Sequence, residues 1–237
     1  ISNCDVGSVT VKLSDEGTYH ITVGCTDMGT GCDTIIAQFA ADVLETPIDN
    51  ISVYGVDTDI SPYDSGSYAS STTYLTGMAA VKACEQLRER IIALAAVRMN
   101  KDASTLTFDG ENVIDESDGA KMSLFDIATA SMCNNEISLE VTYSHSSPVS
   151  PPPFMAACAE IEADPETGAI ELLDYTACVD CGTVVNTNLA RVQTEGGLLQ
   201  GIGMTLYEDI WYDERGKNLS NSFMQYKVPS RLDTDRI

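Results

Sequence analysis

The sequence predicts an α+β fold in which helices pack on mostly antiparallel sheets. Alternating apolar and polar residues over 9–13 and 19–23 flank the turn Asp15-Glu16-Gly17, which is the pattern of a β-hairpin. A broad apolar stripe over residues 75–97 predicts a long helix with one buried face. Most neighbouring strands along the chain are joined by such short turns, with helices between the pairs, and this arrangement is typical of the α+β class.

The other elements of the first half follow from the same patterns. An apolar helix is expected to run to about Leu44, with Asp33 or Thr34 as its N-cap, and residues 51–57 have the composition of a buried strand. Residues 58–73 form a long loop rich in Ser, Gly, Tyr and Asp, and loops of this length are usually functional or disordered. Further elements expected are a hairpin of 104–108 and 112–115, a helix over 123–133 capped by Ser123, and a strand over 137–143.

The second half of the chain is also expected to contain both strands and helices. Strands over 154–163 and 169–179 flank the turn Asp164-Pro165-Glu166-Thr167-Gly168. A helix is expected over 189–206, although its four glycines weaken it and indicate close packing against another element or a ligand. A last hairpin is expected from 207–212 and 222–228. The proline-rich stretch 148–153 marks a boundary, which gives a first α+β lobe over 1–147 and a second over 148–237.

The stretch from Gly24 to Gln38 is the main candidate for a ligand site in the sequence. A strand enters a turn bracketed by glycines and leaves it as a helix, so backbone N–H groups and the helix dipole favour an anion there. Glycines let the main chain approach a bulky ligand closely. The Ser70-Ser71-Thr72-Thr73 cluster precedes the second helix and repeats the same geometry. Such turns are also common as plain connections, so this pattern alone is weak evidence for a ligand.

Composition narrows the classes of partner. Lys+Arg is 13 against Asp+Glu 36, a net charge of −23, which argues against nucleic acid and against an anionic membrane. No apolar run is long enough to span a membrane. The eight scattered cysteines are expected to be free, buried and reduced, as in a cytoplasmic protein. Ile1 enters a strand almost directly and Ile237 follows no closing element, so we expect a piece of a longer polypeptide.

Other possible sites are weaker. Cys178-Val179-Asp180-Cys181 follows a strand rather than starting a helix and has no second cysteine pair, so a redox or zinc role is not favoured. The two histidines form no catalytic pattern. Gln193 beside Gly196 and Gly197 could offer an amide to a heterocycle, or the glycines could serve close helix packing.

Taken together, these stretches resemble the molybdopterin-binding region of the xanthine dehydrogenase/aldehyde oxidase family of molybdenum hydroxylases. The resemblance covers nearly the whole chain and depends on several stretches in register. They are Gly29-Thr30-Gly31-Cys32-Asp33-Thr34 with Gln38, Ala69 to Thr73 with Gly77, Glu160 to Asp164, Asp180-Cys181-Gly182 with Asn186, Gln193 to Gly201, and Tyr226-Lys227-Val228-Pro229 with Asp233.

The resemblance implies a large-subunit domain that holds a molybdopterin cofactor with molybdenum, in bacteria often as the cytosine dinucleotide. Such enzymes hydroxylate an N-heterocycle (a purine or nicotinate-like ring) or an aldehyde with oxygen from water. Electrons pass to iron–sulfur clusters and FAD on other domains or subunits, and the rest of the molybdenum subunit completes the site. The residues expected to contact the cofactor are Gly29, Thr30, Gly31, Asp33, Thr34, Ser70, Ser71, Thr72, Thr73 and Gln193.

Two departures from the family pattern matter. Thr30 stands where the family commonly has Gln, which bears on one cofactor contact and on the cofactor variant. The essential Glu of the family, a general base in a Gly-rich segment after the Tyr-x-x-Pro stretch, is expected beyond Ile237, so no residue here is assigned a catalytic role and the chain alone is expected to be inactive. The alternative is a non-catalytic assembly domain that retains the fold.

Overall fold

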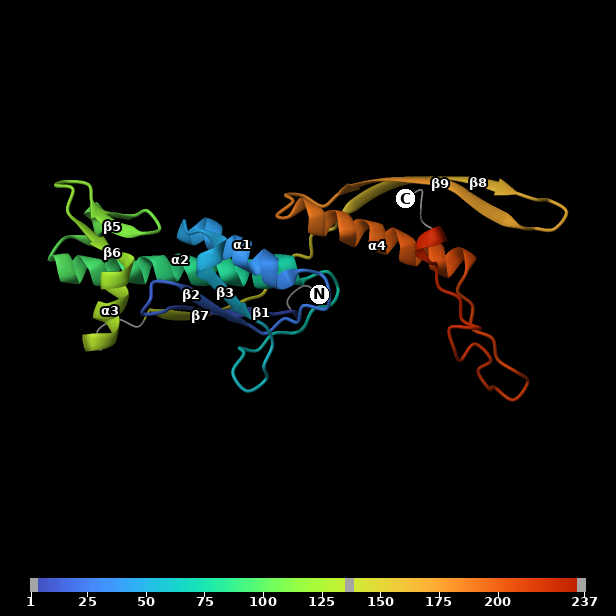
Figure 1. The fold of residues 1–237 in the computed structure, drawn as a ribbon, viewed down its shortest axis with the longest axis horizontal. Coiled ribbons are helices and arrows are strands. Elements are labelled where there is room, and N and C mark those ends of the chain that lie inside the picture. The colour runs from blue at the N-terminus through green and yellow to red at the C-terminus, as the bar shows by residue number, and fades with distance from the viewer. Residues whose placement is uncertain (1–3, 135–138, 234–237) are drawn as a thin grey trace. The chain divides into compact units, whose positions relative to one another are not determined.

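The computed structural model describes residues 4–134 and 139–233. The chain divides into two compact units, Ile1–Ser150 and Pro151–Ile237, which are described separately here (Figure 1). Within the described residues, no helix is long and apolar enough to cross a membrane.

A four-stranded sheet forms the centre of the first unit. Its strands are β1 (Gly7–Leu13), β2 (Tyr19–Val23), β3 (Ile51–Tyr54) and β7 (Glu140–His145), in the order β3-β2-β1-β7. β1 pairs antiparallel with both β2 and β7, while β3 pairs parallel with β2. A parallel partner needs a crossover connection, and the helix that follows β2 supplies it.

Two helices cover one side of this sheet. α1 (Cys32–Leu44) and α2 (Thr72–Met99) pack against each other, α2 lies over β1 and β7, and α1 contacts β3 (Figure 1). Their close approach depends on Gly77, because a Cβ there would lie 2.5 Å from Cε2 of Phe39. The core between helices and sheet is aliphatic, and its largest fully buried side chains include Tyr19, Ile21, Ile36, Leu44, Leu87, Ile91 and Leu94.

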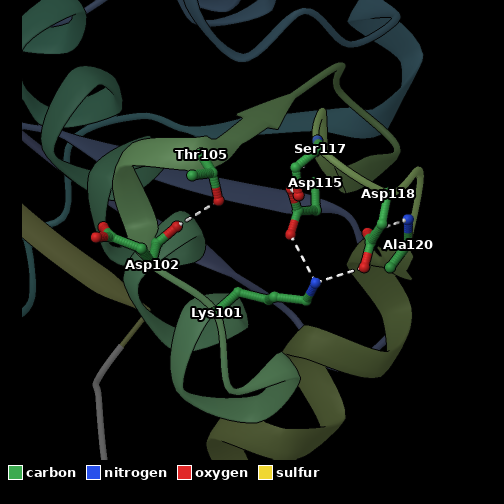
Figure 2. Close-up of polar contacts among 7 residues, drawn as sticks. All are labelled: Lys101, Asp102, Thr105, Asp115, Ser117, Asp118 and Ala120. Carbon is green, nitrogen blue, oxygen red and sulfur yellow. Dashed lines mark hydrogen bonds and ion pairs between the residues drawn. The ribbon is translucent and has the colours of Figure 1, made fainter.

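A small subdomain follows α2. It contains β4 (Leu106–Phe108), β5 (Asn112–Asp115), β6 (Lys121–Ser123) and α3 (Leu124–Asn134). Figure 2 shows how Lys101 holds it to the end of α2: the ammonium lies 2.9 Å from Asp115 and 2.5 Å from Asp118. The Asp115 side chain is almost fully buried, so this ion pair positions the hairpin turn against the helix end.

The second unit contains a long hairpin, β8 (Phe154–Ala163) and β9 (Ile170–Asp180), and the helix α4 (Thr187–Leu206). Asn186 caps α4, since its Oδ1 accepts a hydrogen bond from the Leu189 N–H at 3.0 Å. Short 3₁₀ turns complete the chain at Ile48–Asn50, Ala103–Thr105 and Arg231–Asp233.

The α+β class and most expected elements are confirmed. The hairpins of β1–β2, β4–β5 and β8–β9 form, and α1, α2, α3 and α4 lie where helices were expected. Ser123 caps α3 as predicted, accepting from the Asp126 N–H at 3.1 Å. Part of the strand expected over 137–143 lies outside the described residues.

Several expectations about the fold were wrong. Strand β3 ends at Tyr54 and is half-exposed at the sheet edge, because the parallel pairing with β2 ends there. The last hairpin is reduced to one bridge between Tyr212 and Asn218, since the chain turns at Asp213 but then leaves the ladder. For the glycines of α4 the outcome is divided: Gly203 packs closely against Glu208 and Pro229, a Cβ at Gly196, Gly197 or Gly201 would meet no atom within 4 Å, and contact of these three with a ligand stays a prediction. Four cysteines, at positions 4, 158, 178 and 181, are exposed rather than buried, although the seven cysteines whose side chains the structure describes are free thiols as predicted.

Candidate cofactor-binding site

The glycine turn between β2 and α1 is shaped by an aspartate inside it. Asp27 Oδ1 accepts hydrogen bonds from the N–H groups of Gly29 at 2.9 Å and Gly31 at 3.1 Å. Both glycines have positive φ, 103° and 77°, a backbone conformation that side-chain-bearing residues rarely adopt. The turn therefore requires glycine at these two positions.

Gly31 itself is the N-cap of α1, with no side-chain cap. The predicted cap at Asp33 or Thr34 is therefore wrong, because the helix starts earlier, at Cys32, and both residues lie inside its first turn. Burial alone raises the pKa of Asp27, but hydrogen bonds from the N–H groups of the turn and of Asp33 lower it by more, and its pKa lies below the ordinary value. The chain's own carboxylate thus already uses several donors of the expected anion site.

The long loop over residues 58–71 is ordered by its own hydrogen bonds. Asp64 Oδ2 accepts from the Ser8 N–H at 3.2 Å and from Thr76 Oγ1 at 3.0 Å, and Asp64 Oδ1 accepts from the Gly66 N–H at 2.8 Å. Ser65 pairs with the main chain of Val6. These contacts fix the loop against β1 and the start of α2.

The long loop also joins the glycine turn. Ser67 Oγ accepts from the Thr26 N–H at 3.0 Å and donates to the Thr26 carbonyl at 2.8 Å. At Gly24 the backbones come so close that a Cβ would lie 2.4 Å from the Pro62 carbonyl oxygen. The two loop-to-helix corners expected to form one cradle are therefore neighbours in the first unit.

The second corner contains backbone strain. Ala69 and Ser70 have φ of 53° and 57°, in the left-handed region that non-glycine residues seldom occupy. Strained residues of this kind are concentrated at ligand clamps and active sites. They present the exposed hydroxyls of Ser70 and Thr73 and the half-buried ones of Ser71 and Thr72 at the start of α2.

The remaining predicted residue lies apart from these in the chain. Gln193 is exposed on α4, in the second unit, and its partnership with the two corners stays a prediction. The residues that order the two corners were not predicted: Asp27 within the glycine turn, Asp64 within the long loop, and Ser67, which joins the two. The signal for the two aspartates was present, since Asp-x-Gly is the pattern in which a side chain accepts from a backbone N–H two residues on.

The donor set of the two corners suits an anion held by neutral groups. Segments 24–34 and 58–73 contain no Lys or Arg, so the available donors are hydroxyls and those backbone N–H groups that Asp27 does not already occupy. A Cβ at Gly29 would meet no atom within 4 Å, so the outer side of the turn is open to a ligand.

Comparison with known proteins decides the family. The model of the molybdopterin cofactor-binding domain matches residues 2–234. The chain belongs to this family of cofactor-binding domains. The predicted resemblance to the xanthine dehydrogenase/aldehyde oxidase family is thereby confirmed, and the chain is a molybdopterin-binding domain of this family.

Similar proteins support this assignment over the full length of the domain. "Probable hypoxanthine oxidase XdhD" of Escherichia coli K12 is 35% identical over 237 residues, which are 100% of this chain and 25% of that protein. The nicotine 6-hydroxylase large subunit of Paenarthrobacter nicotinovorans is 30% identical, over 94% of this chain and 28% of that subunit. This molybdopterin-binding domain thus spans about a quarter of the length of these relatives.

Solved structures show the same fold. CO dehydrogenase from Oligotropha carboxidovorans superposes with a TM-score of 0.86 at 27% identity, covering 97% of this chain and 29% of that one. Quinoline 2-oxidoreductase from Pseudomonas putida 86 gives the same TM-score and identity and the same share of this chain, and 30% of its own. The fold predicted for the molybdopterin-binding domain is therefore confirmed.

Proposed function

We propose that this chain is part of the molybdenum-binding subunit of a hydroxylase that oxidises an N-heterocycle, with water as the source of oxygen. Relatives named as a hypoxanthine oxidase, a nicotine 6-hydroxylase and a quinoline 2-oxidoreductase support a purine or pyridine-type ring as the substrate class. An aldehyde is the second substrate class of the family. The single observation that carries the proposal is the joint between Ser67 and Thr26, which brings the two predicted cofactor corners together.

The residues present fit a phosphate-bearing pterin. We assign its contacts to Gly29, Thr30 and Gly31, to the α1 start at Asp33 and Thr34, and to the hydroxyls of the α2 start at Ser70, Ser71, Thr72 and Thr73. Gln193 is assigned a hydrogen bond to the pterin. When bound, the molybdenum cofactor supplies the two-electron oxidation of the substrate. The part of this chain is to bind and orient it, and no catalytic residue is assigned here.

The rest of the enzyme completes the proposal. Iron–sulfur clusters and FAD on other domains or subunits accept the electrons, and the remaining part of the molybdenum subunit contributes the general base and the substrate pocket. The cofactor is proposed to be the cytosine dinucleotide form. The seven free thiols favour a reducing compartment, and we propose the cytoplasm.

The experiment uses the complete enzyme, expressed with its natural partner subunits. Molybdenum and released pterin are quantified in the wild type and in Thr72→Val, Thr73→Val and Gln193→Ala, with Ser52→Ala on the exposed edge strand as control. We expect molybdenum in the wild type and the control and a loss of cofactor in the other variants. Release of a cytosine nucleotide on acid hydrolysis tests the cofactor form.

A second function, a non-catalytic assembly domain, is favoured by one observation, the Thr30 that replaces the Gln common in the family. Correctly assembled enzyme that contains neither molybdenum nor pterin would overturn the proposed hydroxylase and support the assembly role. Cofactor retained at wild-type level in all three variants would refute the assigned contacts.

A further inference from the structure

The second unit has almost no core of its own. Among its side chains that the structure describes, Ile202 is the only apolar one that is buried, at 8% exposed. All ten residues of β8 are exposed, Phe154 at 68% and Met155 at 58%. A two-stranded hairpin that stands alone is at best marginally stable in water. The hairpin of β8 and β9 therefore needs cover from outside the unit.

The two faces of this hairpin differ. On β9 the side chains of Tyr175, Ala177 and Val179 are half-buried, so one face is partly covered within the chain. The opposite face, called the open face here, is exposed on both strands. It consists of the paired residues Phe154 and Asp180, Ala156 and Cys178, Cys158 and Thr176, and Glu160 and Asp174. The centre of the open face is therefore uncharged, and its carboxylates lie at the two ends.

The two strands also lack the residues that protect a sheet edge. β8 and β9 have 10 and 11 residues, and neither contains Pro, Lys or Arg. Over the residues that the structure describes they form a two-stranded sheet, so each strand keeps one unpaired edge. Natural proteins blunt such edges with Pro or charged residues, or cover them with another element. The length and composition of this hairpin thus favour a covered position.

The exposed surface is too large for a complete molecule. The chain exposes 14654 Å², whereas a folded monomer of 25.4 kDa exposes about 10,300 Å², a difference of roughly 4,300 Å². An interface between two domains of one chain commonly buries only about 600–1,500 Å². Most of the excess therefore needs a partner outside these residues. The relatives indicate which one, because this chain matches 25% of the length of the hypoxanthine oxidase and 28% of the nicotine 6-hydroxylase subunit.

We propose that the open face packs against the part of the molybdenum subunit that lies outside these 237 residues. The inference rests on the proposed function, because it takes the chain to be one part of that subunit. Residues 154–180 carry seven carboxylates and no Lys or Arg. The partner surface is therefore expected to be apolar at its centre, with Lys or Arg facing Glu160, Asp174 and Asp180.

Charge disfavours a second copy of this chain on the same face. A two-fold contact would place the carboxylates of two identical hairpins against each other, and juxtaposed like charges oppose association. The net charge of −23 on each chain adds to this repulsion. The remaining part of the subunit is thus the better occupant.

The test uses the complete enzyme, expressed with its partner subunits. A photoreactive benzophenone analogue of phenylalanine replaces Phe154, the aromatic end of the open face, and the cross-linked peptides are identified by mass spectrometry. We expect cross-links to peptides of the molybdenum subunit outside this chain. Cross-links to an iron–sulfur or flavin subunit, to residues 1–150, or to the same hairpin of a second copy would overturn the proposal.

Two native thiols give a readout that needs no variant. Cys158 and Cys178 are both exposed on the open face. In the complete enzyme we expect them to stay unmodified by iodoacetamide until urea unfolds the protein, as mapped by mass spectrometry. Alkylation of both thiols in the folded enzyme would overturn the proposal.

Thr176→Arg tests whether the contact contributes to assembly. On an uncovered hairpin the new charge would be solvated and close to Asp174, whose Oδ2 lies 3.4 Å from Thr176 Oγ1. Under an apolar partner surface the same charge is buried, and we expect the yield of assembled enzyme to fall at least about tenfold. Glu166→Arg, in the turn of the same hairpin, is the matched control and should assemble like the wild type. Equal yields of the two variants would overturn the proposal.

The molybdenum content of the same preparations separates this inference from the proposed function. Enzyme that lacks molybdenum but gives the expected cross-links would overturn the hydroxylase and support the assigned contact. Enzyme that contains molybdenum but has reactive Cys158 and Cys178 would support the hydroxylase and overturn the contact.

Discussion

Ser67 and Thr26 hold each other by two hydrogen bonds, one in each direction, between Ser67 Oγ and the main chain of Thr26. This pair is the described side-chain link between the long loop and the glycine turn. Ser67→Ala removes both bonds and is expected to lower the free energy of unfolding by about 1–2 kcal/mol. Urea unfolding measures this, and in the complete enzyme cofactor content should fall as well. If the urea midpoint of Ser67→Ala is unchanged and matches that of Ser52→Ala, the link between Ser67 and Thr26 does not stabilise the fold.

Gly24→Ala is expected to destabilise the domain more than Ser67→Ala does. Its Cβ would lie 2.4 Å from the Pro62 carbonyl oxygen, and backbone cannot move aside as the end of a flexible side chain can. We expect a loss of roughly 1–3 kcal/mol in urea unfolding. Gly55→Ala is the matched control, because its Cβ would meet only Asp33 Oδ2 at an ordinary 3.6 Å. Equal stability of the two variants would contradict the close approach of loop and strand.

Tyr19→Phe is expected to stabilise the domain. The Tyr19 hydroxyl is buried and has no hydrogen-bond partner among the described residues, and burial also raises its pKa. Removing an unsatisfied buried hydroxyl recovers about 1–2 kcal/mol of desolvation cost. Thermal and urea unfolding measure this, with the exposed Tyr54→Phe as a control expected near zero. Destabilisation by Tyr19→Phe would show that the hydroxyl has a partner, such as an ordered water.

Arg88 ties three elements together. It donates to the Phe108 carbonyl at 2.9 Å and the Val43 carbonyl at 3.3 Å, and pairs with Glu45 at 2.7 Å. Arg88→Ala is therefore expected to cost about 2 kcal/mol in urea unfolding. Arg88→Lys should recover only part of this stability, because a lysine ammonium does not have the planar set of N–H donors of a guanidinium. The control Lys82→Ala breaks an exposed pair with Glu85 and should leave the urea midpoint close to that of the wild type.

Acid is expected to weaken the subdomain of β4, β5 and β6 through Asp115. Hydrogen bonds from Ser117 and the Lys101 ammonium lower the pKa of Asp115 to about 2 (Figure 2). Its unfolded value is about 3.9, so its contribution is fully present above about pH 4 and is lost as pH falls toward 2. Asp115→Asn should flatten the pH dependence of stability in that window, relative to Asp42→Asn on the exposed face of α1. If the stability of Asp115→Asn falls with pH as steeply as that of the wild type, Asp115 is not the group responsible for the loss in acid.

The sequence by itself determined the secondary structure and the family. Periodicity is a local property, so the hairpins, α1, α2 and α4 could be predicted from neighbouring residues, as could the α+β class. The last hairpin and the extent of β3 could not, because strand pairing depends on partners distant in the chain. The order of the glycine turn, the Ser/Thr cluster and the Gln/Gly helix likewise pointed to the molybdenum hydroxylases.

Only the tertiary structure decided which groups meet around the turn. Asp27 occupies N–H groups that a glycine pattern alone suggests are free, and Ser67 reaches Thr26 across 41 residues. Cys25 and Cys32 looked like two of eight scattered cysteines until the turn brought their sulfurs together. Hydrogen-bond partners at long sequence separation are set by backbone position after folding, and this is why spacing in the sequence did not reveal them.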